Sequence, residues 1–452
     1  MFTPFPHQLR LCDFFLDGGN GGAMDPGTGK TFGTILACEA DPLGGSSLVG
    51  CPTVALGVWE REIKLAAPTR SYLILTAKTL KHLRQSIDYV VVSVDLVARN
   101  YKIRQALEKF RAERVIVDEC HYMKGPEAKR TRVWLLDSSA LIKKAIAARR
   151  WLLSGTMAPN HAGELWSLIY STRPDKIGGM SYEEFTDRFC RHKMVKRGPP
   201  GRRFQTRVIS GTNLVRVKEL RKVLAGWWMR VRKSDVLKDL PPKMFRTVPI
   251  DIGKLDTTST RLLESPEGLK LIDAIEAGVE VDIDDETDSM SRVRSLLSEA
   301  KGKFAAEYVA DLLHQGEPGV LLWFWHRHGM DAAQAEFEAQ GIKTCRIDGS
   351  TPDKRRTEIE NYFQHESGPP VFIGQIKAAG VAITLTKAAY EVFAECSWNP
   401  GENWQASDRA HRIGQTRGVR VDFLAIRGTP DEAVLTTIER KTRELDELEK
   451  EV

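Results

Sequence analysis

The chain has 452 residues, a formal net charge of +6, and charged and hydrophobic fractions of 28% and 42%. This length predicts about two to four compact units, each large enough for its own core, and the composition is that of an ordinary globular enzyme. The mildly basic charge permits a nucleic-acid partner without requiring one, and it is well short of that of a polybasic tail.

The seven cysteines form no CxxC pair, which argues against a disulfide framework or a zinc ribbon and for a reducing compartment. No apolar run approaches the length of a membrane span, and the first residues lack the layout of a signal peptide. We therefore expect an intracellular, soluble protein with no membrane partner. We expect a cytoplasmic protein, associated with the nucleoid if its source is a prokaryote. If its source is a eukaryote, we expect a nuclear protein.

The first third of the chain alternates short β-rich runs with helical stretches, and the same texture returns after residue 320. Continuous apolar runs of this kind suit strands that are buried on both faces of a parallel sheet. We therefore expect an α/β protein with two sheets and a different segment between them. The candidate strands are residues 48–51, 72–75, 90–94, 115–117 and 151–153, then 320–325, 344–347, 371–373, 391–394 and 419–426.

The middle of the chain, roughly residues 160–305, carries few strand signals, and residues 163–170 and 181–190 look helical. A basic loop follows around residues 198–201. It is either a solvated surface loop or a loop that contacts phosphates. Its cations are Arg191, Lys193, Lys196, Arg197, Arg202, Arg203 and Arg207. The acidic stretch 282–288 is expected to be an exposed loop.

A helix is well marked near the end of the chain. Thr429 can cap it, Pro430 fits its first turn, and Glu432 completes a capping box. Val434 and Ile438 belong to a partial apolar stripe, so this helix should pack back on the body of the protein.

A phosphate-binding loop is predicted at Gly27-Thr28-Gly29-Lys30-Thr31, after a glycine-rich approach. Small residues let backbone amides approach phosphate oxygens, and a following helix adds its positive end. Lys30 would reach the β- and γ-phosphates of a nucleotide, and the Thr31 hydroxyl would ligate magnesium. The Gln8 amide, which lies before the loop in the chain, is expected to read adenine.

A second part of the site is predicted where the apolar run 115–117 leads directly into Asp118 and Glu119. A buried strand that ends in two carboxylates suits a magnesium-nucleotide site. Asp118 would hold the magnesium, usually through water, and Glu119 would orient and deprotonate the attacking water. Residues 154–156 follow another apolar strand. They are either a plain turn or a link that couples the nucleotide state to another face.

Arg409 and Arg412 lie three residues apart, about one helical turn, so both guanidinium groups are expected to leave the same face of a helix. Arginine stays charged and offers a fixed fork of donors that fits phosphate oxygens. The alternative is structural salt bridging. A phosphate-binding loop early in the chain and arginine fingers late in it imply an ATPase, with ATP and Mg²⁺ as cofactors, whose site closes between two lobes.

In their order, and over nearly the whole chain, these motifs resemble the Swi/Snf family of superfamily-two DNA translocases. The segments that carry the resemblance are residues 7–9, 25–31, 51–52, 59–62, 118–121, 153–156, 346–351, 377–380, 384–386, 398–400 and 408–415. Residues 393–395 and 232–237 are most similar to the annealing-helicase and fork-remodelling branch. The size of the chain resembles a minimal prokaryotic or phage-encoded motor.

The resemblance implies an α/β fold of two RecA-like lobes with parallel sheets, helical protrusions between them and a C-terminal brace helix. Lobe 1 is expected at residues 1–240 with a protrusion at about 160–235, and lobe 2 at residues 241–430 with a protrusion at about 260–305. Residues 431–452 would form the brace helix.

The implied function is an ATP-dependent translocase on double-stranded or forked DNA, which remodels forks or protein–DNA complexes and works as a monomer. The implied nucleotide-binding residues are Gln8, Gly27, Thr28, Gly29, Lys30, Thr31 and Gln405. The implied coupling residues are His121, Ser154, Gly155 and Thr156, and the implied DNA-facing residues are Pro52, Thr53, Ser93, Lys377, Thr384 and Trp398. Two alternatives stay open: a strand-separating helicase on DNA or RNA, and a DNA-binding module with a catalytically dead ATPase core.

Overall fold

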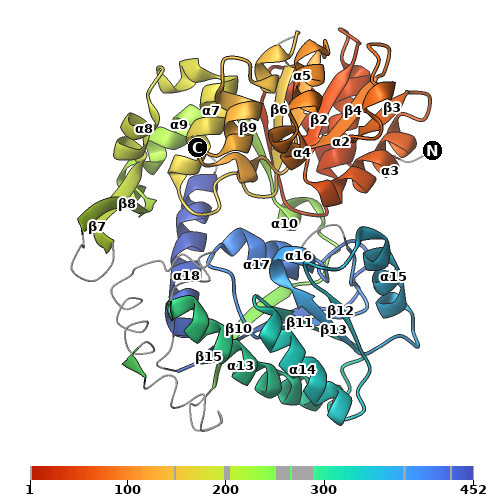
Figure 1. Cartoon of the computed structure of the whole chain (residues 1–452), viewed down its shortest axis with the longest axis vertical. Helices are drawn as coiled ribbons and strands as arrows, with labels where there is room; N and C mark the ends of the chain where they lie inside the picture. The colour runs from red at the N-terminus through yellow and green to blue at the C-terminus, as the bar shows by residue number, and fades with distance from the viewer. Residues whose placement is uncertain are drawn as a thin grey trace. The chain divides into compact units, whose positions relative to one another are not determined.

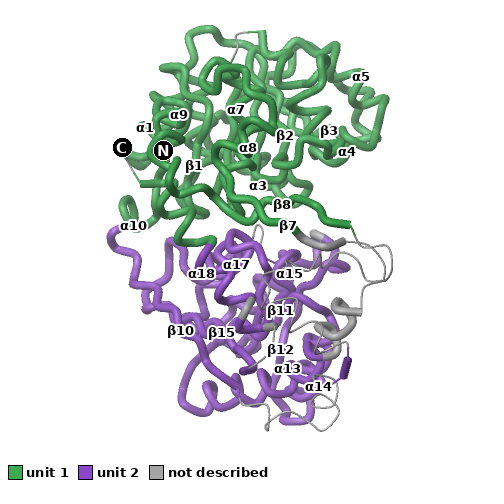
Figure 2. The backbone as a smooth tube through the Cα atoms, turned by 90° about the vertical axis from the view of Figure 1, so that its left-hand side faces the viewer, with its two compact units in different colours: residues 1–237, 441–452 green, residues 238–440 purple. Residues whose placement is uncertain are grey.

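The structure is a computed structural model that describes residues 3–146, 149–197, 204–250, 265–266, 289–379, 383–427 and 430–450. The chain divides into two compact units (Figure 2). Unit 1 consists of residues 1–237 and 441–452, and unit 2 consists of residues 238–440. Among the described residues, no helix combines the length and the apolar character that a bilayer crossing needs.

The sheet of unit 1 has seven strands in the order β3-β4-β2-β5-β6-β1-β9, and all of its pairs are parallel. The five strands predicted in this part of the chain are confirmed. The sequence did not predict β1 or β9, and for β1 the reason is that its glycines carry little strand propensity. The strands are β1 (Gly21–Met24), β2 (Ser47–Cys51), β3 (Tyr72–Leu75), β4 (Tyr89–Ser93), β5 (Arg114–Val117), β6 (Arg149–Ser154) and β9 (Trp228–Val231).

Helices flank this sheet and share its two apolar cores (Figure 1). Along β5, Val115 and Val117 enter one core and Ile116 enters the other, because successive side chains of a strand point to opposite faces. The helices are α1 (Pro6–Leu16), α2 (Lys30–Ala40), α3 (Leu56–Ala66), α4 (Val94–Arg99), α5 (Tyr101–Lys109), α6 (Lys129–Thr131), α7 (Trp166–Thr172), α8 (Tyr182–Phe189), α9 (Val217–Leu224) and α10 (Lys233–Val236).

The middle of the chain contains more strand than the sequence predicted. The expected helical stretches are present as α7 and α8, but β7 (Cys190–Arg197) and β8 (Phe204–Thr212) follow as an antiparallel pair that forms its own two-stranded sheet. The predicted basic loop falls on this pair. Its residues 198–203, with Arg202 and Arg203, lie outside the described residues, as does the acidic stretch 282–288.

Unit 2 contains a six-stranded sheet in the order β10-β15-β14-β11-β13-β12, again with parallel pairs throughout. All five strands predicted in this part are present, and β10 adds an edge that was not predicted. Two parallel sheets, one in each unit, confirm the predicted α/β class. The strands are β10 (Lys243–Ile250), β11 (Val320–Phe324), β12 (Thr344–Ile347), β13 (Val371–Gln375), β14 (Tyr390–Phe393) and β15 (Val419–Ile426). The helices are α13 (Ser289–His314), α14 (Arg327–Ala339), α15 (Asp353–Gln364), α16 (Ile376–Ala379) and α17 (Pro400–Ser407).

The helix predicted near the chain end is α18 (Pro430–Glu449), and its predicted cap, Thr429, lies outside the described residues. The first part of α18 belongs to unit 2, where Val434 and Ile438 pack in an apolar core. From Lys441 onward α18 belongs to unit 1, where the Lys441 Nζ is 3.0 Å from Asn160 Oδ1. Both parts of the helix are thus fixed by side-chain contacts within their own unit.

Candidate functional site

The predicted phosphate-binding loop joins β1 to α2, and we call residues 25–31 the phosphate loop. Gly27 and Gly29 adopt left-handed backbone angles, with φ of 87° and 79°, which favour glycine. Gly29 is also the N-cap of α2, and it offers no side chain to the first amides of the helix. A helix N-terminus of this kind suits an anionic ligand, because its amides and its positive end face the loop.

The first turn of α1 packs directly on the phosphate loop. His7 Nε2 lies 2.7 Å from the Thr28 carbonyl oxygen, and Gln8 Nε2 lies 3.5 Å from the same oxygen. A Cβ atom at Gly29 would come within 2.0 Å of the Gln8 amide, so this close approach requires glycine. The structure therefore brings the predicted adenine reader, Gln8, to the predicted phosphate-binding residues.

The carboxyl end of β5 places Asp118 and Glu119, the acid pair, beside Lys30. The Lys30 Nζ is 3.3 Å from Asp118 Oδ1 and also bonds to Glu119 Oε1. Burial alone would raise the pKa of Glu119, but the nearby Lys30 and His121 outweigh it and hold this pKa below its usual range. The acid pair likewise raises the pKa of Lys30 in spite of burial. The site thus pairs the charged ammonium of Lys30 with the charged carboxylate of Glu119.

Asp118 is further fixed by two donors. The Trp59 indole Nε1 donates to Asp118 Oδ2 over 2.9 Å, and the Glu119 backbone nitrogen donates to Oδ1 over 2.9 Å. Trp59 lies on α3 and is fully buried. The sequence analysis named Trp59 only as part of a motif that resembles the family. It did not predict the bond to Asp118, because no local sequence pattern indicates a contact between residues 59 positions apart.

Glu119 has an unusual backbone. Its φ of 50° places it in the left-handed region, and among the described residues no other residue except glycine has a positive φ. Such a conformation costs about 1–3 kcal/mol and persists where the surrounding structure enforces it, often at functional sites. In this conformation the Glu119 carboxylate pairs with Lys30.

The predicted coupling residues form a connected group. His121 Nδ1 is 3.3 Å from Glu119 Oε2 and 2.8 Å from Ser154 Oγ. Ser154 Oγ in turn bonds to the backbone of Thr156, as donor to its oxygen and acceptor from its nitrogen. A Cβ atom at Gly155 would lie 3.1 Å from Pro26, so this turn also packs against the phosphate loop. A continuous chain of contacts therefore runs from the acid pair to residues 154–156.

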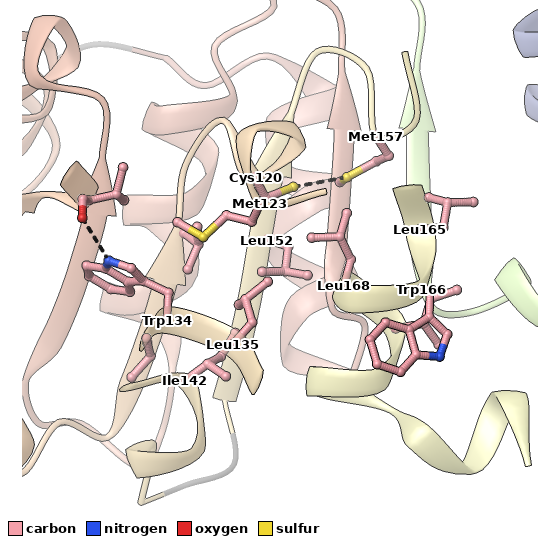
Figure 3. Close-up of a cluster of buried hydrophobic side chains, with 14 of the residues drawn as sticks. Cys120, Met123, Trp134, Leu135, Ile142, Leu152, Met157, Leu165, Trp166 and Leu168 are labelled. Carbon is pink, nitrogen blue, oxygen red and sulfur yellow. Dashed lines mark hydrogen bonds between the residues drawn. The ribbon is translucent and has the colours of Figure 1, made fainter. Parts of the chain in front are cut away.

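Cys120, the next residue after the acid pair, faces the core behind it. Its thiol lies 3.3 Å from the Met157 sulfur, as Figure 3 shows, and both side chains are fully buried. Burial raises the pKa of the Cys120 thiol well above its usual value. Cys120 is therefore a packing residue.

Two of the predicted DNA-facing residues of unit 1 meet at the sheet edge. Thr53 Oγ1 and Ser93 Oγ are 2.9 Å apart; Ser93 is the last residue of β4, and Pro52 and Thr53 follow the end of β2. These three predicted DNA-facing residues therefore lie close together in unit 1, and their contact with DNA stays a prediction.

In unit 2 the predicted helix for the arginine pair is wrong. α17 ends at Ser407, and Arg409 and Arg412 lie in the turns that follow. The Arg409 backbone nitrogen bonds to Ala406 O, three residues back, while the carbonyl of Gln405 accepts from the Arg409 guanidinium instead. This side-chain bond replaces the next helical hydrogen bond. Arg412 Nε likewise donates to the Asp408 carbonyl, over 3.0 Å.

The remaining predicted residues of unit 2 have varied surroundings. The Lys377 Nζ lies 5.9 Å from the centroid of the Trp325 ring, and the Thr384 backbone nitrogen donates to Glu360. Trp398 is partly buried and packs against an apolar core. Residues 380–382, next to Lys377, lie outside the described residues.

Comparison with known proteins places these features in a family. The SNF2-related domain matches residues 17–270, and the helicase conserved C-terminal domain matches residues 305–414. The mouse DNA annealing helicase and endonuclease ZRANB3 is 32% identical over 331 residues, which cover 73% of this chain and 29% of the mouse protein. A Caenorhabditis elegans protein is 29% identical over 446 residues, which cover 97% of this chain and 60% of that protein. It is the SWI/SNF-related matrix-associated actin-dependent regulator of chromatin subfamily A-like protein 1 homolog.

Among solved structures, the Sulfolobus solfataricus SWI2/SNF2 ATPase core in complex with dsDNA aligns with a TM-score of 0.45 and 20% identity, covering 99% of this chain and 97% of that one. The chain spans 29% to 60% of the length of the two curated relatives. The SNF2-related domain alone accounts for more than half of the chain. The chain therefore belongs to the SNF2-related family.

Proposed function

We propose that this chain is an ATP-dependent translocase on double-stranded DNA. The observation that carries the proposal is the cluster of Lys30, Asp118 and Glu119 beside a glycine loop that leads into the N-terminus of α2. A cation, two carboxylates and a helix N-terminus at the carboxyl ends of β1 and β5 form a set that suits phosphoryl transfer to water. The family supports this reading, and ATP is the expected nucleotide.

In this proposal the phosphate loop and Lys30 bind the phosphates, and Gln8 reads the adenine. Lys30 is held by the acid pair in the structure, so a phosphate would replace carboxylate as its partner. Lys30 would thus keep a negatively charged partner throughout, and a buried cation without such a partner would be costly in free energy. Gln405 is proposed to join the nucleotide-binding set.

The residues present also suit magnesium. Asp118 and Thr31 supply carboxylate and hydroxyl oxygens, the hard ligands that Mg²⁺ prefers. Asp118 Oδ1 already neighbours a cation, the Lys30 ammonium at 3.3 Å. When bound, magnesium would neutralise charge on the phosphate oxygens.

Glu119 is the proposed base. Lys30 helps to hold the pKa of Glu119 below its usual range, so the carboxylate is charged in this pairing. If Lys30 moves to a phosphate, that lowering is removed, and Glu119 can accept a proton from a water or orient it. Arg409 and Arg412 are proposed as the arginine fingers that stabilise charge on the terminal phosphate. Arg409 is buried, and its guanidinium donates from Nε to the Gln405 carbonyl and from Nη1 to the Ile383 carbonyl, while Arg412 Nε donates to the Asp408 carbonyl.

DNA is the proposed track, contacted through its backbone and therefore without strong sequence preference. The proposed contacts are Pro52, Thr53, Ser93, Lys377, Thr384 and Trp398. We assign lobe 1 to residues 1–240, lobe 2 to residues 241–430 and a brace helix to residues 431–452, and we propose that the protein works as a monomer. The mouse relative is named a DNA annealing helicase, which supports DNA as the substrate, and we propose forked DNA as one form of it.

The test is steady-state ATPase activity without DNA and with single-stranded, blunt duplex or forked DNA. We expect duplex or forked DNA to stimulate most, and Lys30→Ala to lower turnover by about 10²–10³-fold. Lys64→Ala, which removes an exposed lysine of α3, is the matched control and should retain activity. Near-normal hydrolysis by Lys30→Ala would refute the site assignment.

The other outcomes choose between the alternatives. Preferential stimulation by single strands or RNA would make the chain a strand-separating helicase. No turnover by the wild-type protein under any condition would make it a DNA-binding module with a dead ATPase core. Glu119→Gln should still bind ATP but hydrolyse it slowly, and rapid turnover by this variant would reject Glu119 as the base.

A further inference from the structure

The first residue of the phosphate loop, Asp25, is held from both sides. Asp25 Oδ1 is 2.7 Å from the Arg230 Nη2, and Oδ2 accepts from the Lys233 backbone nitrogen over 2.8 Å. The Asp25 carbonyl oxygen accepts from the nitrogen and the hydroxyl of Thr28, at 3.2 Å and 2.8 Å. The side chain of Asp25 therefore anchors the turn that presents the loop amides.

Arg230 has all three guanidinium nitrogens engaged. It lies on β9, which pairs with β1 and places Arg230 opposite Ala23, just before the loop. While Nη2 holds Asp25, Nη1 donates to the Val231 carbonyl over 2.9 Å, and Nε donates to Glu449 Oε2 over 2.6 Å. Because the guanidinium is planar and rigid, its orientation toward Asp25 depends on what holds the other nitrogens.

Glu449 is the last residue of α18, and its side chain is 2% exposed. A buried carboxylate needs a partner, and Arg230 supplies it. Residues distant in sequence, 25, 230 and 449, are thus joined into one carboxylate–arginine–carboxylate relay inside unit 1.

We propose that Arg230 is a positioning residue for the phosphate loop and that Glu449 orients it, so that the last turn of α18 sets the affinity of unit 1 for nucleotide phosphates. This inference rests on the proposed nucleotide site. Neither Arg230 nor Glu449 is assigned a contact with the nucleotide, since each acts through Asp25. The competing interpretation is that the Glu449–Arg230 pair only ties down the end of the chain.

Glu447 offers a matched control in the same helical turn. Its carboxylate Oε2 is 3.3 Å from the Nη2 of Arg221, a residue of α9 rather than of the strand beside the loop. Glu447→Gln and Glu449→Gln each remove one carboxylate from an arginine and leave the amide shape. Only Glu449→Gln loosens the arginine that holds Asp25.

The test is the dissociation constant for fluorescently labelled ADP and ATP, together with KM and kcat for ATP and the melting temperature of each protein. We expect Glu449→Gln to raise both dissociation constants and KM by about 3- to 10-fold with a smaller change in kcat, and Glu447→Gln to stay near the wild type. Arg230→Lys keeps the charge but loses the fork, so it should weaken nucleotide binding in the same way.

Equal nucleotide affinity of the two glutamine variants would overturn the proposal. If Glu449→Gln fails to fold, Arg230→Lys decides the matter, and its normal nucleotide affinity would reject the positioning role. A wild-type protein that binds no nucleotide would instead refute the proposed function, so the two failures are distinguishable.

Discussion

Replacing Glu391 by glutamine should change how the stability of unit 2 depends on pH. Glu391 lies on β14 and is fully buried, with Oε2 accepting from the Trp323 indole over 2.8 Å and Oε1 accepting from the Ser407 hydroxyl over 3.1 Å. Burial raises the pKa of Glu391 to about 8, although Lys243 and the two hydrogen bonds favour the charged form. At neutral pH the folded protein therefore carries a protonated carboxyl here.

The sign follows from linkage. The unfolded chain ionises Glu391 near its ordinary pKa of 4.5, whereas the folded chain does so only near 8. The folded state thus binds this proton more tightly than the unfolded state does. The contribution of Glu391 to the free energy of unfolding is therefore fully present below pH 4.5 and is lost as pH rises through 8. At about 1.4 kcal/mol per pH unit, the wild type should lose about 3.5 kcal/mol of folding free energy between about pH 5 and 8 from this group.

Glu391→Gln is uncharged at every pH and keeps an oxygen that can accept from Trp323. All other titrating groups are common to both proteins, so their effects cancel in the difference of unfolding free energies. That difference, variant minus wild type, should rise by about 3.5 kcal/mol across the same pH range. The measurement is urea unfolding followed by circular dichroism at several pH values, with Glu338→Gln, an exposed residue of α14, as the control substitution.

A difference that stays flat with pH would refute this reasoning. A difference that falls with pH would show that the folded protein keeps Glu391 charged, with Lys243 as its effective counter-ion.

Three further variants test contacts described above. Trp59→Phe removes the indole donor to Asp118 together with part of a buried ring, and should raise the magnesium concentration for half-maximal ATPase activity about 10-fold. Trp134→Phe loses the same ring volume and an indole bond to a backbone carbonyl elsewhere in unit 1, and should leave that magnesium concentration unchanged. His121→Ala breaks the bond to Ser154, and should lower the ratio of DNA-stimulated to basal ATPase activity more than it lowers basal activity. Gly50→Ala places a methyl group 2.4 Å from the Trp134 ring, and should destabilise the protein by about 1–3 kcal/mol in thermal unfolding.

The parts of the fold that the sequence predicted are those with local signals. Residues 90–92 and 115–117 are apolar at every position, which indicates strands covered on both faces, and the structure buries β4 and β5 fully. The phosphate loop and the acid pair are short contiguous motifs that directly follow strands. The residue types in each motif, and the order of the two motifs in the chain, already indicate a site for a nucleotide with magnesium. The structure adds that Lys30 joins them in space.

The parts that were missed depend on distant partners or on competing local bonds. β1 contains Gly21 and Gly22, and it is a strand because β6 and β9 pair with it on both sides, not because of its own propensity. The helix that was expected to continue through Arg409 ends at Ser407. The Arg409 guanidinium donates to the Gln405 carbonyl, which would otherwise accept the next helical hydrogen bond. No periodicity in the sequence reports such a bond.

The pairing of Lys30 with Glu119 bears on when the proposed base could act. In the structure Lys30 occupies the carboxylate of Glu119, and His121 contacts its other oxygen. A carboxylate paired in this way is a poor base, because removing its cationic partner from a buried site is costly. A terminal phosphate carries more negative charge than the Glu119 carboxylate and would pair with Lys30 in its place. Nucleotide binding would therefore release Glu119, which could then act on water. The proposed base is then available only when its substrate is present, and the path from Glu119 through His121 to Ser154 would change at the same moment.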